Sequence, residues 1–339
     1  MKIIIPMAGM GKRMRPHTLA TPKPLLPIAG KPMVQWIAED IINVCTEQVE
    51  EIAFVIGDFG KEVEEKLISI AENLGAKGKI YYQLEAQGTA HAILCANESL
   101  EEKIVVAFAD TLFDANFKLD EAQEGIIWVQ QIDDPSQFGV VKLDENNIIT
   151  EFAEKPQEFV SDLAIIGIYY FKDGAYLRNE LQYLIDNDIR IKGGEFGLTD
   201  ALENMKAKGT KFTVGAVDEW LDCGNKDATV FTNQRILELN RENAMISSTV
   251  QNNSTEIIKP CYIGENVVLK NSKIGPHVSI GNNTVVENSV IENSIIQTNS
   301  KINGANLANS MIGNFVEYEG NSNQQDVSIG DYSSINSNK

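Results

Sequence analysis

The stretch PMAGMGKRMRPHTLATPKPLLPIAGK, residues 6–31, decides how this chain begins to fold. It follows a short apolar run, Ile3–Ile5, which predicts a buried strand. The chain has 48 Asp and Glu residues, yet none precedes Glu39, whereas six of its 29 Lys and Arg residues lie within the first 31 positions. Exposed backbone amides of glycines and cations that follow a buried strand are typical of phosphate binding. We therefore interpret the stretch as an anion-binding turn rather than a solvated surface loop.

The composition predicts a globular, acidic protein of more than one domain. The chain has 339 residues, of which 43% are hydrophobic, and a net charge of −19, which argues against nucleic acid or an anionic membrane as a partner. Its four cysteines lack metal-type spacing, and no apolar run reaches the ~20 residues of a membrane span. The apolar start is too short for a signal peptide. We expect a cytoplasmic protein with reduced thiols.

Strand and helix patterns alternate through the first part of the chain. The predicted strands are 2–7, 52–56, 79–84, 104–107 and 126–131. The predicted helices are 34–44, 61–74 and 90–97. This alternation predicts an α/β, Rossmann-like, mainly parallel sheet with helices on both faces. Ligands bind beyond the carboxyl ends of such strands, so the opening turn and the segments after Leu84 and Ala107 should line one crevice.

A second set of elements completes the first domain, for which we predict the bounds 1–242. The set comprises a hairpin of 138–143 and 148–153, a strand at 163–171, helices at 174–185 and 199–208, a strand at 211–217 and a helix at 226–241.

Isolated aliphatic residues recur at a fixed period near the end of the chain. The isoleucines at this period are Ile263, Ile280, Ile296, Ile312 and Ile329, with spacings of 17, 16, 16 and 17 residues. Asn, Ser and Gly fill the intervals, as expected where a solenoid turns its corners. A β-sandwich is the alternative, although it would show strands of period two. The repeat resembles the hexapeptide-repeat left-handed parallel β-helix, and we predict a short one of about five turns over 247–339.

Two common nucleotide-binding motifs do not fit the opening turn. The dinucleotide fingerprint would require glycine where Met14 stands, and the Walker motif would require Ser or Thr where Arg13 stands. A nicotinamide dehydrogenase and a P-loop NTPase are therefore both unsupported.

The turn instead resembles the signature of the sugar-1-phosphate nucleotidylyltransferases, or nucleotide-sugar pyrophosphorylases. The matching residues, in order, are Gly9, Gly11, Arg13, Pro16, Thr18, Pro22, Lys23, Leu26 and Pro27. Lys12 departs from the Thr or Ser common in that family. The resemblance implies that Ala8, Gly9 and Gly11 bind the nucleotide and that Arg13 and Lys23 are catalytic cations.

Further segments resemble the family's motifs in the family's order. Gln83, followed by Gly88 and Thr89, resembles the base-recognition segment, where the amide would offer a donor and an acceptor to a pyrimidine edge. Asp110, which follows a predicted strand, and Asp222, within EWLDCG, resemble its two metal-binding aspartates. Alone, each of these residues has an ordinary interpretation, as a surface glutamine or a loop aspartate.

The sugar side of the site has its own motifs. Gly139, the pair Glu154-Lys155 and Gly167 resemble the sugar-phosphate-binding segments, although Glu154 and Lys155 could also be an exposed ion pair. Ile166 stands where relatives that bind an N-acetyl group often have Asn, which weakens the case for an amino sugar.

The resemblance implies a Mg²⁺-dependent enzyme that makes an NDP-sugar and pyrophosphate from an NTP and a sugar 1-phosphate. We expect dTTP or UTP and glucose 1-phosphate as substrates, and a homo-oligomer formed through the β-helix. The alternatives are a non-catalytic regulatory or scaffold relative, and a pyrophosphorylase for another sugar whose β-helix is an acyltransferase. His277 is the only histidine of the repeat region, and we expect it to be structural.

Overall fold

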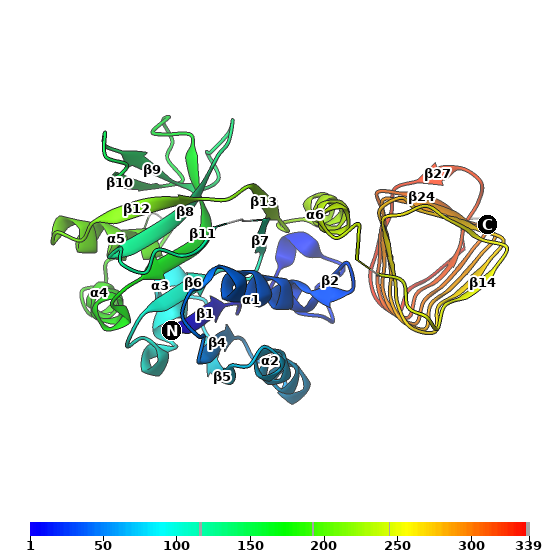
Figure 1. The fold of residues 1–339 in the computed structure, drawn as a ribbon, viewed down its shortest axis with the longest axis horizontal. Coiled ribbons are helices and arrows are strands. Elements are labelled where there is room, and N and C mark those ends of the chain that lie inside the picture. Colours follow the sequence, from blue (N-terminus) through cyan, green and yellow to red (C-terminus); the bar gives the residue numbers. More distant parts are fainter. Residues whose placement is uncertain (115–116, 192, 244, 337–339) are drawn as a thin grey trace. The chain divides into compact units, whose positions relative to one another are not determined.

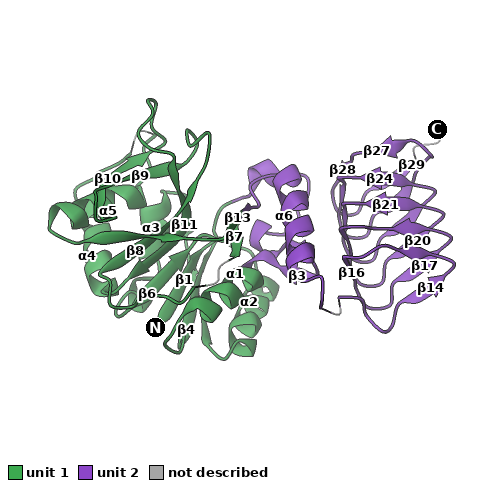
Figure 2. Cartoon of the chain, turned by 45° about the horizontal axis from the view of Figure 1, so that its top comes forward, with its two compact units in different colours: residues 1–9, 35–220 green, residues 10–34, 221–339 purple. Residues whose placement is uncertain are grey.

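The computed structural model describes residues 1–114, 117–191, 193–243 and 245–336. The chain divides into two compact units, both built from separated segments. Unit 1 comprises residues 1–9 and 35–220, and unit 2 comprises residues 10–34 and 221–339 (Figure 2). The domain bounds expected from sequence, 1–242 and 247–339, stay a prediction.

Unit 1 is built on a mixed sheet that has nine strands in the described part of the chain (Figure 1). The strands are β1 (Lys2–Pro6), β4 (Glu51–Ile56), β5 (Lys77–Tyr82), β6 (Ile104–Ala107), β8 (Gly125–Gln131), β9 (Gly139–Leu143), β10 (Ile149–Glu154), β11 (Leu163–Phe171) and β12 (Phe212–Ala216). Strands β5, β4, β1 and β6 are neighbours in that order and run parallel. Strand β11 is antiparallel to β6, β8 and β9. The predicted α/β sheet is thus confirmed, with an antiparallel half added to the parallel one.

Helices follow the strands much as the apolar periodicity predicts. The helices of this part of the chain are α1 (Met33–Val44), α2 (Lys61–Asn73), α3 (Thr89–Leu94), the short 3-10 turn η3 (Asn97–Ser99), α4 (Gly174–Asp186) and α5 (Leu198–Ala207). The sequence did not predict two short strands, β7 (Thr111–Asp114) and β13 (Glu219–Asp222). Four-residue strands carry too few residues for a clear period-two pattern.

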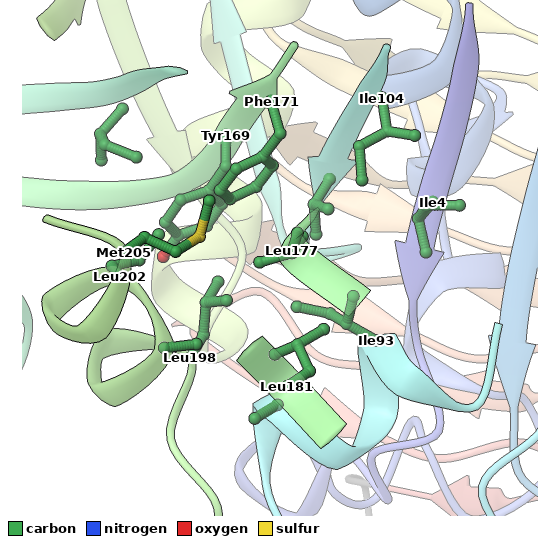
Figure 3. Packing of buried hydrophobic residues seen from close by; sticks show 14 of the residues in the cluster. Ile4, Ile93, Ile104, Tyr169, Phe171, Leu177, Leu181, Leu198, Leu202 and Met205 are labelled. Atoms are coloured by element: carbon green, nitrogen blue, oxygen red, sulfur yellow. The ribbon is translucent and has the colours of Figure 1, made fainter. Parts of the chain in front are cut away.

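The core of unit 1 lies between the sheet and helices α3, α4 and α5 (Figure 3). Tyr169 and Phe171 project from β11 toward Leu177 and Leu181 of α4. The opposite face of the parallel strands is also buried, as Phe54 of β4 is fully inaccessible. Because both faces are covered, these strands carry the near-continuous apolar runs by which the sequence analysis found them.

Unit 2 begins with the opening turn and then continues far along the chain. Its first elements are the 3-10 turns η1 (Lys12–Met14) and η2 (Lys23–Leu25), the strands β2 (Pro27–Ile28) and β3 (Lys31–Pro32), and later the helix α6 (Lys226–Leu239). Asn225 caps α6 by accepting a hydrogen bond from the Ala228 amide at 3.0 Å.

The rest of unit 2 is a parallel β-helix, which Figure 1 shows end-on and Figure 2 from the side. In the described residues it has three sheets. The first contains β14 (Gln251–Asn253), β17 (Val268–Lys270), β20 (Val285–Glu287), β23 (Lys301–Asn303), β26 (Glu317–Glu319) and β29 (Ser334–Asn336). The second contains β15 (Glu256–Ile257), β18 (Lys273–Ile274), β21 (Val290–Glu292), β24 (Asn306–Ala308) and β27 (Gln324–Gln325). The third contains β16 (Cys261–Ile263), β19 (Val278–Ile280), β22 (Ile295–Ile296), β25 (Met311–Ile312) and β28 (Ser328–Ile329).

The isoleucine period marks the third sheet. Ile263 pairs with Ile280 and Ile280 with Ile296, and the register continues through Ile312 to Ile329. All five side chains are buried inside the coils. The predicted solenoid is confirmed, and its arrangement is consistent with the left-handed β-helix.

Among the described residues, no helix has the length and apolar character needed to cross a membrane.

Candidate active site

Three predicted site segments of unit 1 follow the carboxyl ends of parallel strands. Ala8 and Gly9 follow β1, Gln83 follows β5, and Asp110 lies three residues beyond β6. These strands are parallel, so their carboxyl ends lie along one edge of the sheet. The structure therefore brings these segments to the edge at which open α/β sheets bind ligands.

The Gln83 side chain is held in one orientation. Its Nε2 donates to the Gly88 carbonyl oxygen at 3.1 Å and lies 3.0 Å from Nδ1 of His91. Burial lowers the pKa of His91, so the imidazole is neutral near pH 7 and Nδ1 can accept this hydrogen bond. Turning the amide over would place its oxygen against the Gly88 carbonyl. The donor of Gln83 is therefore used within the protein, and its oxygen remains to face a ligand.

Gly88 occupies a position that no other residue type can take without strain. Its φ is +105°, and a Cβ atom there would lie 2.4 Å from the Phe196 carbonyl oxygen. The Ala90 amide donates to that same oxygen, and the Phe196 amide donates to Gln87. The Thr89 hydroxyl accepts from the Leu198 amide at 3.0 Å and so supports the start of α5. Nothing local in the sequence marks His91 as a partner of Gln83 or Phe196 as a neighbour of Gly88, so neither residue was predicted for the site.

Asp110 lies in a turn that Gly167 anchors. The Phe108 amide donates to the Gly167 carbonyl oxygen at 3.0 Å. Gly167 has a φ of +87° at an irregularity in the pairing of β11 with β8, and a Cβ there would lie 3.4 Å from Oγ1 of Thr111. The structure thus gives Gly167, predicted to bind the sugar phosphate, a direct role in placing the Asp110 turn.

Gly139 and Glu154 face each other across the hairpin of β9 and β10. A Cβ at Gly139 would lie 3.2 Å from Oε2 of Glu154, so glycine leaves room for this carboxyl group. Burial raises the pKa of Glu154, the charge of Lys155 opposes that rise, and Asp200 adds to it. Lys155 has a left-handed φ of 43°, and its Nζ is 3.9 Å from Glu154 Oε1, so the ion pair is loose. The carboxyl group of Glu154 and the ammonium group of Lys155 are thus neighbours, and both residues are exposed, so both can contact a ligand.

The opening turn in unit 2 is folded tightly around Gly11. Gly11 has a φ of +56°, and a Cβ there would lie 3.0 Å from Cβ of Lys23 and 3.0 Å from Cγ2 of Thr18. Oγ1 of Thr18 donates to the Gly11 carbonyl oxygen at 2.8 Å. Lys23 is only 8% exposed, whereas Arg13 is exposed. Besides the buried Lys23, the turn thus carries three exposed cations, Lys12, Arg13 and Arg15.

The opening turn rests on α6 and the β-helix within unit 2. Oδ1 of the fully buried Asn233 accepts from the Ala29 amide at 2.9 Å and from the Ser279 hydroxyl at 2.7 Å. Gly30 packs against the Tyr262 ring so closely that a Cβ would lie 2.2 Å from it. No motif in the sequence marks Asn233 or Tyr262, because their partners are distant along the chain.

His17 is a second support of the turn and is 1% exposed. Its Nε2 lies 3.0 Å from the hydroxyl oxygen of Ser328. Burial is the main cause that lowers the pKa of His17 to about 4. The imidazole is therefore neutral and forms part of the packing between the turn and the last coils.

Asp222 ends β13, and Gly224 leaves space for its side chain, because a Cβ there would lie 2.7 Å from Asp222 Oδ2. In the parts of the chain that the structure describes, no group of three or more His, Cys, Asp or Glu residues could hold a metal by itself. Mg²⁺ is commonly bound by one or two carboxylates together with substrate phosphates and water. The chemistry of Asp110 and Asp222 therefore fits Mg²⁺ that arrives with a nucleotide.

The predicted residues fall in both units. Arg13, Lys23, Gly11 and Asp222 belong to unit 2, and the remaining predicted site residues belong to unit 1. An α/β sheet with the predicted site segments at its strand ends, followed in the chain by a parallel β-helix, is an architecture consistent with the nucleotidyltransferases. A family model described as nucleotidyl transferase matches residues 2–239, and the chain belongs to this family.

Curated relatives include several sugar nucleotidyltransferases. The chain is 32% identical over 257 residues to the bifunctional protein GlmU of Methanococcus maripaludis (strain C5), which is 75% of this chain and 58% of the relative. It is 28% identical over 247 residues to the low-salt glycan biosynthesis nucleotidyltransferase Agl11 of Haloferax volcanii, 70% of this chain and 66% of that protein. The chain thus spans 55–62% of the length of GlmU proteins that it matches.

Two solved structures share the fold. A protein assigned as a glucose-1-phosphate thymidylyltransferase from Bacillus anthracis, in complex with sucrose, matches with a TM-score of 0.58 and 24% identity over 68% of this chain and 93% of that one. A UDP-glucose pyrophosphorylase in complex with UDP-glucose matches with a TM-score of 0.58 and 22% identity over 70% and 98%. At these identities the likeness supports the fold alone.

Proposed function

We propose that this protein transfers a nucleotidyl group from an NTP to a sugar 1-phosphate and releases pyrophosphate. The observation that carries the proposal is the fixed amide of Gln83, whose oxygen remains for a base at the nucleotide-binding edge of the sheet. Membership of the nucleotidyl transferase family and the names of the curated relatives support the same reaction class.

The chemistry needs charge neutralisation more than proton transfer. A sugar-phosphate oxygen attacks the α-phosphorus, a P–O bond forms, and the bond to the bridging oxygen breaks as pyrophosphate leaves. Since the second pKa of a phosphate monoester is about 6, the nucleophile is already a dianion near neutral pH. No general base is then required. Catalysis rests on placing the attacking oxygen in line with the leaving group and on stabilising the negative charge of the reacting phosphates.

We assign each positively charged residue of the site to one of the phosphate groups. Arg13 and the amides of Gly9 and Gly11 are assigned to the β- and γ-phosphates, where the leaving group gains charge. Lys23, held near Gly11, is assigned to the α-phosphate, and Lys155 to the incoming sugar phosphate.

Asp110 and Asp222 are the residues that would hold Mg²⁺, which supplies charge neutralisation at the reacting phosphates when bound. Asp110 is positioned by the hydrogen bond from Phe108 to Gly167, and the carboxylate of Asp222 has its space because Gly224 lacks a side chain.

Base choice follows from the direction of the Gln83 amide. An acceptor oxygen pairs with the ring N–H of uracil, thymine or guanine. Adenine and cytosine offer it only an exocyclic amino group, which lies at a different place on the base edge and would require a shifted base. UTP or dTTP, with glucose 1-phosphate, is our assignment. GTP has the same donor and is the strongest competitor, and a guanylyltransferase subunit of Drosophila melanogaster is among the relatives, at 34% identity over 190 residues.

A pyrophosphate-release assay with the full chain tests the proposal. We expect turnover with UTP or dTTP and glucose 1-phosphate, and none with ATP or CTP. Asp110→Asn and Lys23→Ala should each lower turnover at least ~100-fold, the scale of a lost electrostatic stabiliser. Asp120→Asn and Lys77→Ala change exposed residues of the same types and should leave turnover unchanged. Unaltered turnover in Asp110→Asn or Lys23→Ala would refute the assignments.

The structure offers no support for acyltransferase chemistry at His277. Its Nε2 lies 2.5 Å from Glu238 Oε1, and its backbone amide donates to the Pro260 carbonyl oxygen. The imidazole thus joins the β-helix to α6 within unit 2, as a structural residue would. If the wild type released no pyrophosphate with any sugar phosphate in the assay above, the result would favour the alternative of a non-catalytic scaffold protein.

A further inference from the structure

Two acceptors hold the amide group of Gln83. Its Nε2 donates to the Gly88 carbonyl oxygen at 3.1 Å and to Nδ1 of His91 at 3.0 Å. A primary amide nitrogen has two hydrogens, so these two contacts use both donors of the side chain. Turning the amide over would replace two hydrogen bonds with two contacts between acceptors, which is costly where the groups are partly buried. The direction of the Gln83 amide is therefore decided by its two partners.

The two partners differ in what they can do. A backbone carbonyl is always an acceptor, and the Gly88 carbonyl is held in place because it also accepts from the Ala92 amide at 3.0 Å. An imidazole nitrogen, in contrast, accepts or donates according to which of the two ring nitrogens carries the proton. Nδ1 of His91 accepts from Gln83, which places the proton on Nε2. Only the His91 contact depends on the choice of a side chain.

The surroundings of His91 preserve this acceptor. The ring is partly buried, and burial lowers its pKa against the opposing charge of Glu85, so Nδ1 keeps its lone pair near pH 7. Sγ of Cys95 lies 4.0 Å from the same nitrogen, and a thiol is too weak a donor to displace an amide at 3.0 Å. Nδ1 is thus committed to Gln83.

We propose that His91 is a specificity-determining residue, whose Nδ1 keeps the Gln83 oxygen toward the nucleotide and so selects a base with a ring N–H. This inference rests on the proposed function, because it takes Gln83 as the contact of the base. A reversed amide would instead donate to the ring nitrogen of cytosine or adenine. A site whose polar groups match one base edge leaves them unpaired against the other, which is a strong source of discrimination. His91 acts through Gln83 and is therefore a positioning residue.

Equilibrium binding of NTPs without a sugar phosphate tests this inference separately from turnover. UTP and CTP are the first pair of probes, because they share ring size, sugar and phosphates and differ at the base edge; GTP and ATP are the second pair. We expect the wild type to prefer UTP to CTP or GTP to ATP. His91→Phe keeps a planar ring but removes the acceptor, so the preference within that pair should fall at least ~5-fold, the effect of one hydrogen bond. His91→Ala adds no bulk and should show the same fall.

Two matched variants separate positioning from packing. In His91→Asn, Oδ1 branches from Cγ as Nδ1 does and can accept from Gln83, so the wild-type preference should be retained. Cys95→Ala removes the thiol beside the same nitrogen and should also retain it. A merely structural role of His91 would instead weaken the binding of both members of a pair equally.

The outcomes are distinct from those of the proposed reaction. A wild type without preference in either pair would overturn the inference, as would a full preference in both His91→Phe and His91→Ala. Equal weakening of both nucleotides in these variants would also overturn it. A wild type that selects its base through His91 yet releases no pyrophosphate would support the role of His91 and refute the reaction.

Discussion

Gly88 offers the sharpest test of how the fold holds Gln83. In Gly88→Ala, the new Cβ would lie 2.4 Å from the carbonyl oxygen and 2.7 Å from the amide nitrogen of Phe196, and neither backbone atom can rotate away. The variant therefore has to displace Phe196. That displacement breaks the hydrogen bonds from Ala90 to Phe196 and from Phe196 to Gln87.

Gly75 supplies the control. It has a φ of +80°, yet nothing lies within 4 Å of an added Cβ. Gly75→Ala should therefore show only the cost of a left-handed alanine, about 1–2 kcal/mol. Gly88 has φ 105° and ψ 177°, a conformation that essentially only glycine adopts, so Gly88→Ala carries at least that cost, about 1–3 kcal/mol. It also loses two hydrogen bonds at about 0.5–1.5 kcal/mol each. The extra 1–3 kcal/mol corresponds to a further fall in Tm of roughly 2–12 °C.

Two measurements check this reasoning. Thermal unfolding of both variants should give the difference in Tm, and NTP binding should separate them again. Displacing Gly88 removes the carbonyl that orients Gln83, and one lost hydrogen bond of about 1 kcal/mol weakens binding roughly fivefold. Gly75→Ala should bind NTP like the wild type. If Gly88→Ala matched Gly75→Ala in both stability and affinity, the role assigned to Gly88 would be wrong.

Two further predictions concern the support of the opening turn. Asn233→Ala leaves the buried Ala29 amide and Ser279 hydroxyl without their acceptor, which should destabilise unit 2 by roughly 2–6 kcal/mol. Calorimetry should show this loss, and initial rates should show a higher KM for NTP. An unchanged unfolding profile would argue against the contact. Because of His17, the free energy of unfolding should fall as the pH is lowered. The pKa of this imidazole is about 4 in the folded protein and about 6.5 in the unfolded chain. As pH falls through that window the unfolded chain takes up the proton first, so the wild type should lose about 3 kcal/mol more than His17→Gln between pH 7 and pH 4. Equal losses in urea unfolding at the two pH values would contradict this.

Regular patterns in the sequence predicted most of the fold. The isoleucine period located the β-helix, because each coil must bury one aliphatic residue in register with the next. The apolar runs located the parallel strands, because both of their faces are covered. The strands of the antiparallel half were also predicted as segments, including the hairpin of β9 and β10. The short strands β7 and β13, and the antiparallel pairing of β11 with β6 and β8, could not be found this way. They depend on the pairing of distant segments rather than on local periodicity.

Motif resemblance supplied the residues of the candidate site, whose roles stay a prediction, but it did not supply their hydrogen bonding. Motif order identified Gln83, whereas only the structure shows that His91 and the Gly88 carbonyl occupy its donor. Gly167 was expected to contact the sugar phosphate, and the structure adds its hydrogen bond to the Asp110 turn. The contact of Asn233 with Ala29 spans 204 residues, and no short motif can encode such a separation.

The support of the opening turn has a consequence for synthesis of the protein. His17 contacts Ser328, 311 residues later, and both lie in unit 2. At a translation rate of roughly 5–20 residues per second, about 15–60 s separate the two on the ribosome. During that interval a nascent chain holds Arg13 and Lys23 without the last coils beneath them. The opening turn is thus among the first segments translated and among the last to reach its final surroundings.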